Sequence, residues 1–163
     1  MNILKKNIKF LFSIFIVFCL SINSNSVLAA SSGGDTGSSL YKSGKKLVIK
    51  AKKLEKKDKI VKAEKLYLKA LVKLEKAYAK DKKNPDILNY LGYALRKTGN
   101  LERAETFYLE GLKLDASHLG INEYLGELYV QTGRIELAKE RLQVLKGCKC
   151  EEYDELKELI EKN

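Results

Sequence analysis

The stretch "YLGYALRKTGNLERA", residues 90–104, is followed thirty-four residues later by "YLGELYVQTGRIELA", residues 124–138. Seven of the fifteen aligned positions are identical, and they include the pairs Gly92 with Gly126 and Gly99 with Gly133. Apolar residues recur at three- and four-residue spacing in both copies, which predicts amphipathic helices. Gly99 and Gly133 are suited to end a helix, because glycine readily adopts the left-handed conformation. A helix–turn–helix unit of this period buries its apolar stripe only by stacking on copies of itself.

The chain from Leu40 onward shows the same spacing, and no stretch alternates with the period of two that marks a strand. The sequence therefore predicts an all-α fold. Asn84 and Pro85 favour a helix start, Ser117 is a candidate cap, and Gly147 is a candidate stop. The predicted helices span residues 40–56, 60–80, 86–97, 101–114, 119–132, 134–146 and 151–161. Connections of two to five residues predict that neighbouring helices pack antiparallel.

The repeated residues resemble the tetratricopeptide repeat family, whose pattern places Leu-Gly in a first helix and Ala, an aromatic and a small residue in a second. One copy carries Leu91, Gly92, Leu95, Ala104, Tyr108 and Gly111, and the next carries Leu125, Gly126, Tyr129 and Ala138, with Leu142 and Leu145 in place of the aromatic and the small residue. The resemblance implies a solenoid of antiparallel helix hairpins. This predicted solenoid has two firm repeats near 85–118 and 119–152, a degenerate repeat near 51–84 and a C-terminal capping helix.

Gly92 and Gly126 stand inside predicted helices, where glycine costs about 1 kcal/mol relative to alanine. We expect them to lie where the two helices of a unit cross most closely. The degenerate repeat retains Ala70 and Leu74 in its second helix, but Lys57 and Asp58 stand where Leu-Gly is expected. Its first helix is therefore predicted to be longer or shifted.

The amino terminus carries Lys5, Lys6 and Lys9, then an apolar run over residues 10–20, then small residues up to Ala29. This order predicts a signal peptide over residues 1–29. The run is shorter than the roughly 20 residues that span a bilayer. The Ser- and Gly-rich residues 30–39 predict a flexible linker before a helical domain over residues 40–163. The protein is accordingly expected to be exported, to the periplasm or alternatively to the exterior.

The segment from Lys42 to Lys83 contains 17 lysines, five acidic residues and no arginine. Such a run usually forms a solvated face. The alternative is a surface that binds a polyanion or a membrane. Bidentate phosphate recognition would favour arginine, and nucleic acid is not expected as the partner of an exported chain.

In this family the first helices of the repeats line a concave groove that holds a partner, so the resemblance implies a protein or peptide partner. Tyr93 and Arg96 are expected to point out of the stack and to contact it. The groove positions carried over to this sequence are Asn89, Tyr93, Arg96, Lys97, Glu123, Glu127, Val130 and Gln131.

Cys148 and Cys150 are the only cysteines outside the predicted signal peptide. A disulfide is the first expectation in an oxidising compartment. The alternatives are free or mixed-disulfide thiols in a redox function, and metal binding, for which two ligands fall short of the usual four.

The sequence shows no catalytic constellation, because its single histidine, His118, lies in a predicted turn without a partner group. We expect neither enzymatic activity nor a cofactor or metal. The residues predict no oligomeric state. The expected function is that of an interaction scaffold or adaptor of the bacterial cell envelope.

Overall fold

The structure, a computed structural model, describes residues 36–163, so the predicted signal peptide lies outside the described residues. This part of the chain contains only helices, which confirms the predicted all-α fold. None of its helices is long and apolar enough to cross a membrane. The helices are α1 (Gly37–Glu55), α2 (Ile60–Lys80), α3 (Pro85–Lys97), α4 (Leu101–Leu114), α5 (Leu119–Gln131), α6 (Ile135–Leu145) and α7 (Glu151–Glu161).

The helix ends follow the capping residues closely. Asn84 accepts hydrogen bonds from the backbone N–H groups of Asp86 and Ile87 at the start of α3. Gly99, Gly133 and Gly147 have φ angles of 83°, 73° and 98°, as expected for residues that follow a helix end.

One predicted boundary and one predicted capping residue are wrong. Helix α1 begins at Gly37, where the Thr36 side chain caps it by accepting from the Ser39 N–H at 3.1 Å, so the last three residues of the predicted linker over 30–39 are helical. His118, rather than Ser117, caps α5, since its Nδ1 accepts from the Ile121 N–H at 3.2 Å. Serine was a reasonable expectation by residue type, but the Ser117 hydroxyl bonds Asp115 instead.

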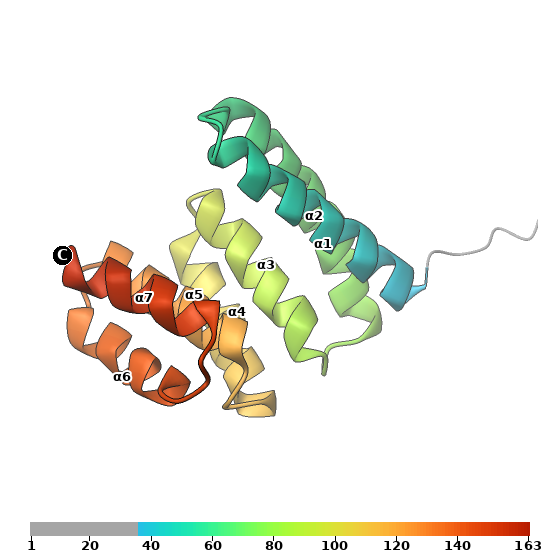
Figure 1. The fold of residues 1–163 in the computed structure, drawn as a ribbon. Coiled ribbons are helices and arrows are strands. Elements are labelled where there is room, and N and C mark those ends of the chain that lie inside the picture. The colour runs from blue at the N-terminus through green and yellow to red at the C-terminus, as the bar shows by residue number, and fades with distance from the viewer. Residues whose placement is uncertain (1–35) are drawn as a thin grey trace, which may run out of the picture. The chain divides into compact units, whose positions relative to one another are not determined.

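The helices pair as three antiparallel hairpins, α1–α2, α3–α4 and α5–α6, which pack in sequence order, and α7 lies against α5 and α6 (Figure 1). The first hairpin starts at Gly37 rather than near residue 51. Its helices have 19 and 21 residues, against 13 and 14 in α3 and α4. The degenerate repeat is therefore a complete hairpin with longer helices, and its first helix ends at Glu55, near the predicted start of the repeat.

Glycines mark the closest approach between packed helices. A β-carbon on Gly92 would lie 2.4 Å from the ring of Tyr108 on α4, the second helix of its own unit, as expected. In α1, a β-carbon on Gly44 would lie 2.6 Å from Leu74 of α2. Gly44 thus does in the first hairpin what Gly92 does in the second.

Gly126 differs from this expectation. A β-carbon there would lie 2.5 Å from Leu156 of α7, not against a residue of α6. Leu142 stands where the preceding unit has Tyr108, and its shorter side chain leaves the space that Leu156 fills, completely buried. The capping helix therefore packs on Gly126, the position that contacts the second helix of the same unit in the preceding repeat.

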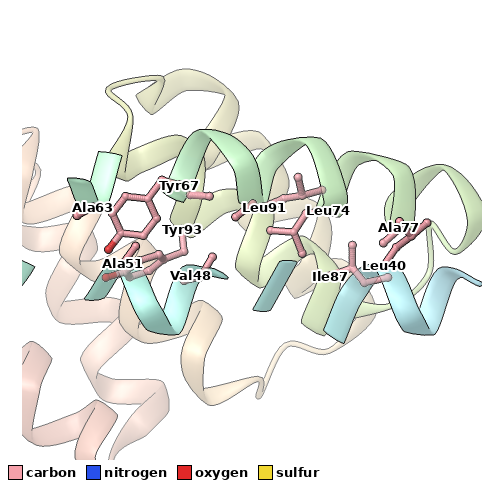
Figure 2. Close-up of a cluster of buried hydrophobic side chains, with 12 residues drawn as sticks. Leu40, Val48, Ala51, Ala63, Tyr67, Leu74, Ala77, Ile87, Leu91 and Tyr93 are labelled. Atoms are coloured by element: carbon pink, nitrogen blue, oxygen red, sulfur yellow. The ribbon is translucent and has the colours of Figure 1, made fainter. Parts of the chain in front are cut away.

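A core of small and large apolar side chains joins α1, α2 and α3 (Figure 2). Leu74 and Leu91 lie in its centre, and Tyr67 and Tyr93 stand beside Ala51 at one end, with ring centroids 5.9 Å apart. The first hairpin is consequently a full member of the stack.

Replacing Gly92 by leucine is expected to destabilise the protein by about 1–3 kcal/mol, because the new side chain overpacks the contact with Tyr108. Lys53→Ala, on the exposed side of α1, should change the free energy of unfolding by no more than about 0.5 kcal/mol. Denaturant unfolding of both variants checks this. Equal stability would mean that the α3–α4 contact is not close at this position.

Candidate functional site

The eight predicted groove residues do not form an open surface. Tyr93 is only 4% exposed and belongs to the core, and the Arg96 side chain is 9% exposed. Asn89, Glu123 and Val130 are also buried, Lys97 and Glu127 are partly buried, and Gln131 is exposed. The expectation that Tyr93 and Arg96 point out of the stack is therefore wrong.

The extended helix α1 covers part of these positions. The Lys52 ammonium donates to the Tyr124 hydroxyl at 3.1 Å and lies 5.3 Å from the ring centroids of both Tyr93 and Tyr124. The two tyrosine rings are themselves 4.6 Å apart. Lysine held over two aromatic faces is stabilised by cation–π attraction. This contact joins α1, α3 and α5 across the face that the resemblance implies for a partner.

A second contact from α1 engages the side chain of Lys97. Its ammonium lies 2.8 Å from a Glu55 carboxylate oxygen, and the other oxygen of Glu55 accepts from the Tyr67 hydroxyl at 2.8 Å. Glu55 is the only acidic residue of α1. Its two partners tie the carboxyl end of α1 to α2 and α3.

Arg96 and Glu127 form an ion pair between α3 and α5. The guanidinium also lies 5.4 Å from the Tyr93 ring, and its Nε has no hydrogen-bond partner among the described residues. A pair this strongly withdrawn from water holds the two helices in place only while both charges are present.

Helix α7 brings a third carboxylate to this pair. Oxygens of Glu123, Glu127 and Glu155 lie within 4.8 Å of one another. Burial raises the pKa of Glu123 to about 9, and its hydrogen bond with Glu155 and the charge of Glu127 act in the same direction. Glu123 is thus protonated at neutral pH and Glu127 is neutralised by Arg96. Two of the three carboxylates therefore do not offer the charge with which carboxylates bind a divalent cation.

The open part of this face is a cavity of about 410 Å³ where α3, α5 and α7 begin. Its lining combines acidic, aromatic and hydroxyl groups: Asp86, Asn89, Tyr90, Asp115, Ser117, His118, Leu119, Gly120, Tyr124 and Glu152. Asn89 is the only predicted groove residue among them. Its Oδ1 is buried without a hydrogen-bond partner in the described part of the chain. Gly120 leaves room for this amide, since a β-carbon there would lie 2.8 Å from its Nδ2.

The side chains that line the cavity include three acids, and the nearby Lys45 of α1 lies 5.2 Å from the ring centroid of Tyr90. Asp86, Asp115 and Glu152 line the cavity, and its one group able to become cationic, His118, has its Nε2 3.4 Å from an Asp86 oxygen. Tyr90 and Tyr124, which also line it, were not predicted as site residues. The available signal was their repetition at the start of both quoted stretches.

Cys148 and Cys150 are joined in a disulfide, with their α-carbons 5.2 Å apart, as first expected. The bridge lies in the connection between α6 and α7. Metal binding requires thiolates, so the metal alternative does not apply to the bonded form.

Comparisons with known proteins agree with the repeated geometry. A family profile described as tetratricopeptide repeat matches residues 62–118. The chain therefore carries the tetratricopeptide repeat over these residues. No curated protein matches the sequence significantly.

Solved tetratricopeptide structures share its fold at low sequence identity. A tetratricopeptide repeat protein from Parabacteroides merdae superposes with a TM-score of 0.53 at 19% identity, over 74% of this chain and 60% of that one. The second such domain of human RPAP3, in complex with an HSP70 peptide, gives 0.52 at 19%, over 78% and 99%. The Arabidopsis OM64 domain gives 0.51 at 13%, over 76% and 98%. The chain thus spans about three fifths of the Parabacteroides protein and nearly all of the other two domains.

Arg96→Ala is expected to lower the free energy of unfolding by about 3 kcal/mol, because it leaves the Glu127 charge in a largely dry site. The double variant Arg96→Met/Glu127→Leu should recover most of this loss, since no charge then remains unpaired. Denaturant unfolding compares the two. A double variant no more stable than the single one would show that the ion pair is not the interaction that holds α3 to α5.

The Glu123 carboxyl should make stability depend on pH. Its folded pKa of about 9 lies above the ordinary value of 4.5, so between these values the folded protein holds a proton that the unfolded chain has released. The free energy of unfolding therefore falls as pH rises through this window. Glu123→Gln should remove this contribution. The melting temperature of this variant should therefore rise relative to that of the wild type as the pH increases. Glu64→Gln, at an exposed position on α2, serves as the control, and parallel pH profiles for all three proteins would contradict the assignment.

Proposed function

We propose that this tetratricopeptide protein is a non-enzymatic interaction scaffold or adaptor of the bacterial cell envelope, exported to the periplasm, and that it binds a protein or peptide partner. The observation that carries the proposal is the cavity formed where α3, α5 and α7 begin. The RPAP3 domain of the same fold holds a peptide, which supports the class of partner. The order of basic, apolar and small residues over 1–29 supports export.

The contacts of the concave face determine where on it a partner can bind. Its middle is filled by Lys52, Arg96 and the glutamates of α5 and α7, so a segment passing through it would have to displace buried ion pairs. The cavity needs no such displacement. It also offers an unbonded Asn89 oxygen and three acidic side chains, which suit a segment with hydrogen-bond donors and positive charge.

Charge reversal at the cavity tests the proposal. Asp86→Lys/Glu152→Lys is expected to abolish recovery of the partner in a crosslinking pull-down from the native envelope. Both residues lie in the first turn of a helix, where loss of an acid costs about 0.3–1 kcal/mol each. Glu102→Lys/Glu136→Lys makes the same charge change in the first turns of α4 and α6, which do not line the cavity.

The control variant should retain the partner. Loss of the partner with both variants, or with neither, would refute the cavity as the binding site. The same preparation tests export, because the protein should be found in the periplasmic fraction with a mass that begins at Ala30 or Ser31. A full-length mass in the membrane fraction would refute it.

A further inference from the structure

The first hairpin has a side that none of the other described helices covers. Helices α1 and α2 contact each other and α3, and they lie at one end of the stack, with α3 on one side and none of the described helices on the other (Figure 1). In a solenoid such an end normally carries a polar cap. Here the two helices of the terminal hairpin themselves face the solvent.

The uncovered side of α1 is almost purely basic. Residues 42, 46, 49 and 53 share one face of the helix, because they are spaced by three and four residues. Four exposed lysines lie on or beside this face, Lys42, Lys46, Lys50 and Lys53, and the only acid of α1, Glu55, is engaged by Lys97 and Tyr67 elsewhere. None of the four makes an ion pair within the described chain.

Helix α2 also exposes a lysine row and an apolar stripe, and its exposed acids Glu64 and Glu75 lie on the other side of the stripe. Lys62, Lys65, Lys69 and Lys76 are exposed and, like those of α1, have no acidic partner in residues 36–163. Beside this row Val61, Leu68 and Val72 follow one another at spacings of seven and four, opposite the buried Ala63, Ala70 and Leu74. They are 67%, 50% and 53% exposed, and Ile49 of α1 is 40% exposed.

We propose that this surface, the basic face, docks on an anionic phospholipid bilayer. The basic face is defined as the eight lysines just named together with Ile49, Val61, Leu68 and Val72. Lysines near an anionic leaflet are each attracted by its surface potential. Exposed aliphatic side chains that flank them can enter the boundary between headgroups and acyl chains, as on interfacial amphipathic helices.

Two observations favour a bilayer over a soluble polyanion. The basic face contains no arginine, the residue suited to bidentate phosphate contacts. It also exposes aliphatic residues, which gain nothing from a hydrated polyanion but are removed from water in a bilayer. The inference is independent of the cavity, which no residue of α1 or α2 lines.

Sedimentation with lipid vesicles tests the inference. The full chain is expected to bind vesicles of phosphatidylcholine with about one third phosphatidylglycerol, and not vesicles of phosphatidylcholine alone, with binding weakened by salt. Replacing Lys42, Lys46, Lys50 and Lys53 by glutamine should lower the partition coefficient by a factor on the order of 100. Replacing four exposed lysines elsewhere, Lys113, Lys139, Lys146 and Lys157, changes the net charge equally and should reduce binding much less.

A second variant separates the bilayer from other anions. Val61→Ser/Leu68→Ser/Val72→Ser keeps every lysine and changes only exposed positions, so it should fold and still bind vesicles several-fold more weakly. Heparin binding of this variant should be unchanged. Equal vesicle binding by the serine variant and the wild type would indicate a polyanion surface instead. Equal effects of the two lysine sets, or no vesicle binding at all, would overturn the proposal. All variants share the same residues 1–35, so that segment cannot account for the differences.

Discussion

The packing of this chain depends on close approaches between helices at glycines, three of which stand in the first helix of a hairpin. Gly44, Gly92 and Gly126 each leave space for a large side chain from a neighbouring helix, and the three occupants are Leu74, Tyr108 and Leu156. A leucine or tyrosine that fills such a space makes dispersion contacts on all sides. The distance between the helices is then limited by the backbone itself. This limit offsets the roughly 1 kcal/mol that glycine costs inside a helix.

The contact between Gly126 and Leu156 determines how the concave face is closed. Because Leu156 fills the space at Gly126, α7 must lie across α5, and Glu155 is brought beside Glu123. From the other end, the long helix α1 carries Lys52 to Tyr124 and Glu55 to Lys97. The positions that a longer solenoid would present to a partner are thus bonded to this chain's own first and last helices. What remains open is the cavity at the amino-terminal ends of α3, α5 and α7.

The fold could be predicted from local signals, whereas the site could not. Helix bounds follow from capping residues and glycines next to each element, such as Asn84 and Gly99, which act over a few residues. Burial of Tyr93 involves Lys52 of α1 and Tyr67 of α2 instead, and Arg96 pairs with Glu127 of α5. These elements are far from α3 in the sequence or belong to another repeat. The family pattern does not contain the extension of α1. Nor does it indicate that Leu156 of α7 packs on Gly126, where the preceding repeat uses an aromatic residue of its own second helix. Gly44, followed by Val48 and Ala51, was the readable sign that α1 packs as a first helix.

The two proposed contact surfaces have opposite charge and lie on different elements, and this arrangement has a physical consequence. The cavity is lined by Asp86, Asp115 and Glu152, whereas the basic face belongs to α1 and α2. Because the two surfaces have no residue in common, a bilayer on the basic face and a cationic segment in the cavity would contact different side chains. Had the eight lysines of the basic face lined the cavity instead, the lipid and the cationic segment would have competed for one surface. The separation would instead let one chain hold a partner beside a membrane, as the proposed envelope adaptor requires.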